Sequence, residues 1–190
     1  MAALRKEGEY AYGPIGKDCE FRLKISDVVI IGKWKKGSKN KEGTGFRITK
    51  NNHVWQGEFK EGKLVRGRKI DEHGTVHEGL WDGNNKKYGY GRVRGLDGYE
   101  YSGEYLEGVK HGQAKERKAN GEWFSGRFER GKITGFGSLR WPDEHSFTGH
   151  WKDGKPHGRG LKEYPDGSIY DEEWEEGVVV KSVFVEKRRK

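Results

Sequence analysis

The chain has 190 residues, of which 31% are hydrophobic and 36% are charged, so a large globular core is excluded. Its 31 glycines exceed the average usage of roughly 7%, and its net charge is +8. The single cysteine, Cys19, excludes an intramolecular disulfide and indicates a reducing, cytoplasmic compartment. Since no apolar run approaches the ~18 residues of a membrane-spanning helix, we expect a soluble protein.

The first segment, residues 1–28, does not follow the pattern of the rest of the chain. Its residues 21–25 alternate between apolar and basic side chains, which is typical of a strand. We therefore predict an N-terminal capping segment, with a partner-specific arm as the alternative.

A repeating unit follows, and residues 147–169 show it best. Phe147, Gly149 and Trp151 have the same parity, so in a strand they lie on one face. Gly154 lies in a turn sequence, and the glycine-bearing strand that follows ends at a second turn sequence. The pattern predicts a β-hairpin followed by a tight turn.

The unit recurs along the chain with a period of about 23 residues, which is typical of repeat arrays. The glycine between the two aromatic or apolar residues, called here the signature glycine, advances by 25, 22, 24, 23 and 23 residues. The six signature glycines are Gly32, Gly57, Gly79, Gly103, Gly126 and Gly149. A seventh unit begins at Tyr170 but has Glu172 at this position, and the unit from Tyr101 has Ala114 where a further glycine is expected.

The organisation predicted from this period has three parts. Residues 1–28 form the cap, residues 29–177 form the repeat array, and residues 178–190 form a closing strand with a basic tail. The closing strand is predicted because residues 178–185 are mostly β-branched and apolar.

An aromatic-x-Gly-x-aromatic signature followed by a glycine turn and Gly-x-Gly is similar to the MORN repeat, so the chain resembles a MORN-repeat protein of about seven repeats. The resemblance implies an all-β fold: an elongated single-layer antiparallel sheet of tandem β-hairpins, a MORN-repeat solenoid. It also implies a groove that binds partner segments or mediates self-association. The resemblance points to axonemal, cell-division and membrane-contact settings without choosing among them.

No catalytic or metal site emerges from the sequence. Three G-x-x-x-x-G-K matches lack the Ser or Thr that would hold magnesium, and no helix follows them. One cysteine and seven scattered histidines do not form a zinc-binding pattern. Thirty acidic residues dispersed among the basic ones disfavour nucleic acid. We expect no cofactor, no metal and no enzymatic activity.

The function predicted is a non-catalytic scaffold for other proteins, a subunit of a larger cytoplasmic or cytoskeletal assembly, with an axonemal one among the candidates. Aromatic residues on the well-formed units are the candidate groove: Tyr105, Phe128, Trp141, Trp151 and Tyr164. The alternative is a peripheral adaptor that binds anionic phospholipid or an acidic partner through basic residues. These residues are Lys33, Lys35, Lys36, Lys39, Lys41, Lys187, Arg188, Arg189 and Lys190.

Overall fold

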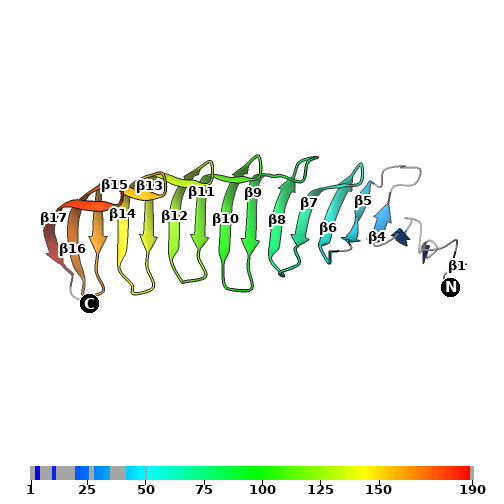
Figure 1. Ribbon diagram of the computed structural model, residues 1–190, viewed down its shortest axis with the longest axis horizontal. Helices are drawn as coiled ribbons and strands as arrows, with labels where there is room; N and C mark the ends of the chain where they lie inside the picture. The colour runs from blue at the N-terminus through cyan, green and yellow to red at the C-terminus, as the bar shows by residue number, and fades with distance from the viewer. Residues whose placement is uncertain are drawn as a thin grey trace. The chain divides into compact units, whose positions relative to one another are not determined.

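The computed structural model describes residues 3–4, 10–11, 20–25, 28–34, 42–49 and 51–188, which form strands and turns and no helix (Figure 1). The chain divides into two units, unit 1 (Met1–Leu96) and unit 2 (Asp97–Lys190). Each unit is an antiparallel sheet built from hairpins. The predicted all-β fold of tandem hairpins is therefore confirmed.

Among the residues that the structure describes, unit 1 contains nine strands. They are β1 (Ala3–Leu4), β2 (Tyr10–Ala11), β3 (Glu20–Ile25), β4 (Val28–Trp34), β5 (Gly43–Ile48), β6 (Val54–Lys60), β7 (Lys63–Ile70), β8 (Val76–Trp81) and β9 (Lys87–Arg94). Strands β1 to β8 each pair with the strand that follows them in the chain. Strand β3, from the segment expected to cap the array, thus pairs with β4.

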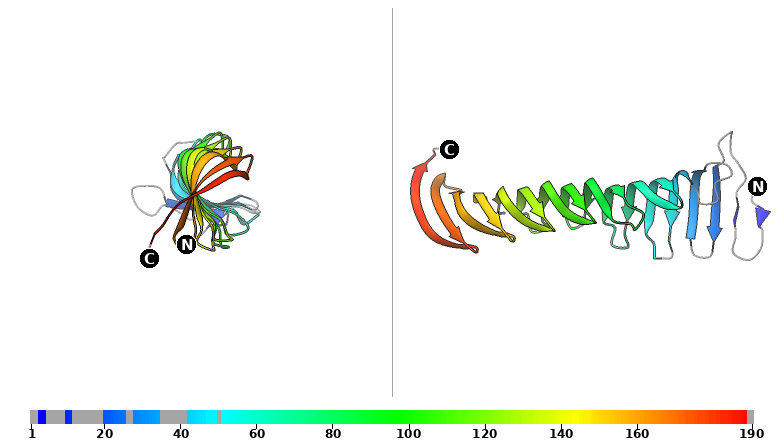
Figure 2. Two further views of the ribbon diagram at one scale, coloured as in Figure 1. Left: turned by 90° about the vertical axis from the view of Figure 1, so that its left-hand side faces the viewer. Right: turned by 90° about the horizontal axis from the view of Figure 1, so that it is seen from above.

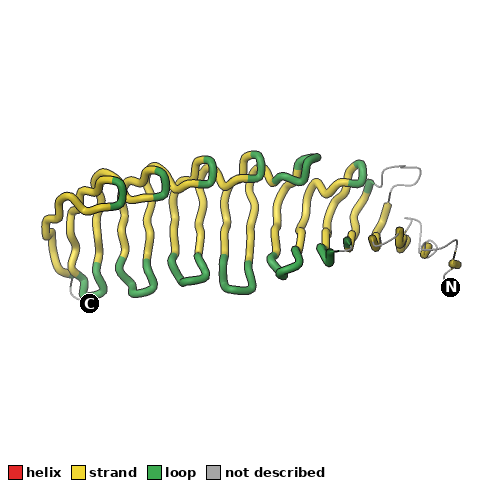
Figure 3. Tube along the Cα trace, viewed as in Figure 1, coloured by secondary structure: helices red, strands yellow, loops and turns green. Residues whose placement is uncertain are grey.

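In unit 2, residues 97–188 contain eight strands, which also pair in chain order. They are β10 (Glu100–Leu106), β11 (Val109–Arg117), β12 (Trp123–Glu129), β13 (Lys132–Arg140), β14 (Ser146–Lys152), β15 (Lys155–Glu163), β16 (Ser168–Glu175) and β17 (Val178–Lys187). Turns join these strands alternately at their two ends (Figure 3), and the last two strands curve along their length (Figure 2).

Two kinds of turn alternate in unit 2. The short turns have a charged residue followed by glycine, both at positive φ, as at Arg130 (47°) and Gly131 (82°). This is the conformation of a type I′ hairpin turn, whose twist matches that of the strands. The Gly131 amide also donates to the carbonyl of Lys110 at 2.9 Å, and the Gly154 amide donates to that of Ile133 at 2.9 Å. The short turns are therefore hydrogen-bonded from one hairpin to the next.

The signature glycines allow neighbouring strands to cross closely. Gly126 pairs with Gly137, and a Cβ added at Gly126 would lie 2.8 Å from the Gly137 Cα and 2.6 Å from Cζ of Phe124. The ring of Phe124 therefore lies over two bare backbones, which explains why an aromatic residue precedes the glycine. In the unit from Tyr101, Ala114 fits because its partner Gly103 has no side chain.

The face of unit 2 that carries these residues, here called the signature face, holds a continuous aromatic core, the ring core. Successive ring centroids in it lie 5.1 to 5.7 Å apart, mostly edge to face. That geometry is favourable because it sets the positive edge of one ring against the negative face of the next. Its members are Tyr101, Tyr105, Phe124, Phe128, Phe147, Trp151 and Trp174.

Unit 1 has a smaller apolar cluster among its described residues. Phe59, Leu64 and Trp81 are buried, and Trp55 packs against them with its ring 6.0 Å from that of Trp81. The sequence accounts for the smaller cluster, since His77 stands in the third repeat where the fourth, fifth and sixth repeats have Tyr101, Phe124 and Phe147.

Candidate functional site

The five aromatic residues predicted to line a groove fall into two groups. Tyr105, Phe128 and Trp151 are part of the ring core, with 8%, 2% and 5% of their surface exposed, so a partner cannot reach most of each ring. Trp141 and Tyr164 lie outside the ring core, and Tyr164 is 40% exposed. Of the five residues, only Trp141 and Tyr164 are therefore partly or largely exposed.

Trp141 and Tyr164 occupy the same position, the start of the longer turns of unit 2. The amide of Trp141 donates to the carbonyl of His145 at 3.0 Å, and the amide of Tyr164 donates to that of Ser168 at 2.9 Å. Each turn contains a Pro-Asp pair, which is good turn chemistry and sets the first residue at the rim of the sheet. Because the two turns belong to consecutive repeats, the rings of Trp141 and Tyr164 lie at the same rim of the sheet.

Three further rings join these two in a line that we call the aromatic row. Trp141 stacks on His145 (4.3 Å between centroids), which lies 6.4 Å from Tyr164. Tyr164 meets Tyr170 edge to face at 5.5 Å, and Tyr170 meets Phe184 at 5.6 Å. Phe184 is 56% exposed, and the other four rings are partly exposed. The aromatic row is thus accessible, unlike the ring core.

A buried lysine lies beneath the aromatic row. The Lys162 ammonium is 3.7 Å from the centroid of Trp141 and 5.9 Å from that of Tyr164, which are cation–π contacts. Burial lowers the pKa of Lys162, while the carboxylates of Glu172 and Asp143 act in the opposite direction. The cation holds the two rings in place from below.

Glu172, which replaces the seventh signature glycine, is also buried in this region. One of its oxygens lies 3.4 Å from the Ser182 hydroxyl, which donates to it. Because a carboxylate stands here instead of glycine, its negative charge stabilises the protonated form of the nearby Lys162.

A hollow of about 590 Å³ opens beside the aromatic row. It is lined by Tyr164, Pro165, Asp166, Ser168 and Tyr170. Asp166 accepts from the Ser168 amide and from Lys187, whose Nζ is 2.7 Å away. The hydrogen bond from Lys187, together with those from Ser168, holds the pKa of Asp166 well below its usual range. The hollow therefore has aromatic walls with one charged pair at the rim.

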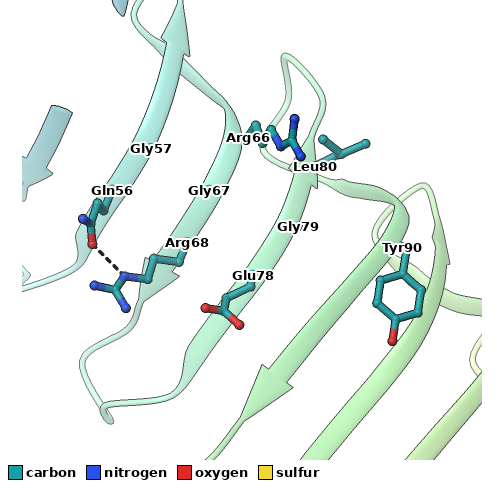
Figure 4. A pocket seen from close by; sticks show the side chains of 9 residues that line it. All are labelled: Gln56, Gly57, Arg66, Gly67, Arg68, Glu78, Gly79, Leu80 and Tyr90. Atoms are coloured by element: carbon teal, nitrogen blue, oxygen red, sulfur yellow. Dashed lines mark hydrogen bonds between the residues drawn. The ribbon is translucent and has the colours of Figure 1, made fainter. Parts of the chain in front are cut away.

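Unit 1 carries a shallow trough of about 780 Å³ (Figure 4). Its floor is the bare backbone of Gly57, Gly67 and Gly79, and its sides are Gln56, Arg66, Arg68, Glu78, Leu80 and Tyr90. Among its polar side chains, Arg68 donates to Gln56 at 2.7 Å, and the Glu78 carboxylate lies 3.6 Å from the Arg94 guanidinium. The trough offers fewer apolar anchors than the aromatic row.

The described part of unit 2 also contains a polar cluster inside its aromatic core. Buried Glu116 accepts from the Tyr99 hydroxyl at 2.9 Å and from the ammonium of Lys110. Lys110 in turn lies 5.0 Å from the ring centroid of Tyr101. Burial, assisted by the Glu116 charge, raises the pKa of Tyr99 far above its usual value. The hydroxyl therefore stays protonated and donates its hydrogen bond to Glu116.

The basic residues of the lipid alternative are mostly outside the described side chains. Of these nine basic residues, only Lys187 and Arg188 have described side chains. Lys187 pairs with Asp166, and Arg188 pairs with Glu186 at 3.1 Å. Within the described ranges, no helix is long and apolar enough to cross a bilayer. The same residues contain no group of three or more His, Cys, Asp or Glu side chains that could hold a metal ion.

Comparison with protein families matches the MORN repeat at residues 101–123, 124–146 and 147–169. These three segments are MORN repeats. Each begins at the aromatic residue that opens a hairpin in unit 2, so the matched boundaries agree with the structural period. The aromatic row starts in the second and third MORN repeats and continues into β16 and β17.

Among solved structures, the chain is similar to the G-box domain of the microcephaly protein CPAP. The identity is 13%, the match covers 94% of this chain and 100% of that chain, and the TM-score is 0.40. The TCP10 domain of Danio rerio CPAP matches at 14% identity over 96% of this chain and 99% of that chain, with a TM-score of 0.34. At such values the likeness says nothing about function. No curated protein matches the sequence.

Sequence reasoning missed His145, Tyr170 and Phe184 as members of the aromatic row. His145 ends the turn that Trp141 begins, and this pairing could have been found from the repeat positions. Phe184 could not, because its contact with Tyr170 depends on a register shift between Ile169 and Tyr170.

Proposed function

We propose that this chain is a non-catalytic protein-binding scaffold and that a segment of its partner lies along the aromatic row of unit 2. The observation that carries the proposal is the accessible line of five rings from Trp141 to Phe184, beside a hollow. Large, rigid rings bury much surface with little loss of conformational entropy, and they dominate the energy of many interfaces.

The sheet beneath the row supports this role because it is rigid. The ring core packs the signature face, and the short turns are hydrogen-bonded between hairpins. A partner that binds a preformed row loses less free energy in ordering the site than one that binds a flexible loop.

A non-catalytic role is supported by the chemistry of the buried polar groups. Tyr99 and Tyr105 have raised pKa values because they are buried, with Glu116 adding to the effect, so neither becomes a base near pH 7. Lys110 and Glu116 neutralise each other inside the ring core. We infer that these groups stabilise the array, as expected for a structural subunit of a cytoplasmic or cytoskeletal assembly.

Affinity capture from native cell extract tests the proposal. We expect the W141A/Y164A variant to retain its melting temperature and to lose more than about tenfold in captured partner, since truncating central aromatic residues commonly costs this much. The matched control is F136A/L161A, which removes two exposed apolar side chains, 61% and 49% exposed, from other positions of unit 2. Equal capture by both variants and the wild type would rule out the aromatic row as the docking surface.

A further inference from the structure

The positive charge of the chain belongs to unit 1. Its 96 residues include 21 basic and 12 acidic ones, whereas the 94 residues of unit 2 include 17 basic and 18 acidic ones. Unit 1 therefore carries a net charge of +9 and unit 2 a net charge of −1. The acidic residues that disfavour nucleic acid for the chain as a whole are thus more frequent in unit 2. A strongly positive part of a protein is typical of a surface that binds an anionic polymer.

The arginines of unit 1 gather on one face of its sheet, here called the arginine face, which is turned away from Trp55. Successive residues of a strand point to opposite faces, so Gln56 lies on the arginine face. Side chains directly opposite each other across antiparallel strands share a face, and the register runs from Gln56 to Arg68, Glu78 and Arg92. Four of the five arginines with described side chains in unit 1 lie there: Arg66, Arg68, Arg92 and Arg94.

Most guanidinium groups of the arginine face are not paired with a carboxylate. Of Glu58 and Glu78, which share the face, only Glu78 makes an ion pair within the described residues, with Arg94 at 3.6 Å. Arginine suits phosphate better than lysine does, because its planar fork donates two parallel hydrogen bonds. Three exposed guanidinium groups without an ion pair in the described part of the chain remain for a ligand: Arg66, Arg68 and Arg92.

Exposed aromatic rings lie among these arginines. Tyr90 is 56% exposed and stands at the wall of the trough (Figure 4). Phe46 faces Gln56 and Tyr88 faces Leu80 across the strands, and both of these partners line the trough. The three rings are the exposed Phe, Tyr and Trp side chains of the described part of unit 1. Between them the glycine floor of the trough lets a planar group approach the backbone closely.

We infer that the arginine face of unit 1 binds single-stranded nucleic acid, with phosphates on the three unpaired arginines and bases stacked on Tyr88 and Tyr90. Stacking on exposed rings requires unpaired bases and accepts any sequence, because every base has a π-face. Four strand spacings separate Phe46 from Tyr88, or about 19 Å, which is room for a short run of nucleotides. An acidic peptide matches the charges but has no planar groups for the rings. The inference does not depend on docking at the aromatic row.

Fluorescence anisotropy of the full chain with a fluorescein-labelled oligothymidylate of about 12 nucleotides tests the inference. Three phosphate contacts predict that the logarithm of the affinity falls with the logarithm of salt concentration at a slope of about −2. R66Q and R92Q should each reduce this slope by about 0.7 and weaken binding roughly fivefold at ~0.1 M salt, the counterion-release value for one phosphate. K86Q, which removes one exposed lysine of the same unit, is the matched control and should leave both quantities unchanged.

The rings are tested separately from the charges. Y90A should weaken binding roughly tenfold without changing the salt slope, because it removes stacking alone, and Y90F should bind as the wild type does. Absence of binding at about 100 µM protein in low salt, the weak end of non-specific affinities, would overturn the inference. Equal binding of a duplex of the same length would do so too, since paired bases cannot stack on the rings. An oligoglutamate of equal charge that displaces the DNA as well as unlabelled DNA does would assign the face to acidic peptides instead.

Discussion

Lys87 shows how a single charged residue is held in the apolar part of unit 1. It is 6% exposed, its ammonium lies 5.5 Å from the ring centroid of Trp81, and it donates to the carbonyl of Arg92 at 3.1 Å. Burial lowers the pKa of Lys87 to about 8, and the carboxylate of Glu78 only partly opposes this. The charged form is therefore disfavoured in the folded state.

This gives a prediction for the pH dependence of stability. Between pH 8 and the ordinary lysine pKa of 10.5, the unfolded chain binds the proton that the folded chain has lost. Stability therefore rises with pH in this window, by about 2 kcal/mol between pH 8 and 10. We expect K87M to lack this rise, as measured by urea unfolding at pH 7, 8, 9 and 10.

The control is K86M, which changes the exposed lysine next to it in the chain. K86M should follow the wild-type curve. If K87M also follows it, then Lys87 remains charged in the folded protein up to the pH at which the unfolded chain loses its proton.

At the scale of the strand pair, the signature glycine sets how closely two strands can approach. A Cβ at Gly149 would lie 2.7 Å from the Gly160 Cα, 2.7 Å from Cζ of Phe147 and 2.8 Å from the carbonyl oxygen of Arg159. Two of these atoms belong to backbone and cannot move without separating β14 from β15.

We therefore predict that G149A destabilises the protein by about 1 to 3 kcal/mol, the usual cost of overpacking a filled site. Thermal unfolding followed by circular dichroism measures it. G83A adds the same methyl group where the nearest atom is the flexible Nζ of Lys63 at 3.5 Å, so it should be nearly neutral. Equal melting temperatures for the two variants would show that close contact between β14 and β15 is not needed.

The hairpins could be predicted from the sequence because their signals are local. Turn residues such as Asp166 and Gly167 specify their own conformation, and the period of the signature glycines fixes where the next strand begins. Burial could not be predicted in this way. Tyr105 is buried by Tyr101 of the same strand, and this ring packs on Phe128 of the next MORN repeat. Such contacts depend on how consecutive hairpins stack.

The residues proposed for docking were partly predictable for the same reason. Trp141 and Tyr164 were identified by their spacing from the Gly-x-Gly pairs, but their exposure follows from the turns that begin at them. Lys162 contacts Trp141 across 21 positions of sequence, and no local pattern distinguishes it from the exposed lysines.

At the scale of the whole molecule, the two units differ in how their apolar contacts are connected. In unit 2 the ring core links hairpin to hairpin from Tyr101 to Trp174. In the described part of unit 1, the core cluster is Phe59, Leu64 and Trp81, with Trp55 against it. Because a repeat array is stabilised by each unit and its nearest neighbours, the connected rings should make unit 2 the more resistant to local opening.

Hydrogen exchange measured by mass spectrometry gives the corresponding prediction. Amides of β12 to β15 should exchange at least about tenfold more slowly than those of β6 to β8, since opening them requires the separation of packed rings. F124A, which removes a ring in contact with both Phe128 and Trp151, should speed exchange throughout these four strands and leave β6 to β8 unchanged. The matched control F136A removes an exposed ring from β13 and should have little effect. Equal protection of the two units, or a loss confined to β12 in F124A, would show that the hairpins of unit 2 are not coupled through their rings.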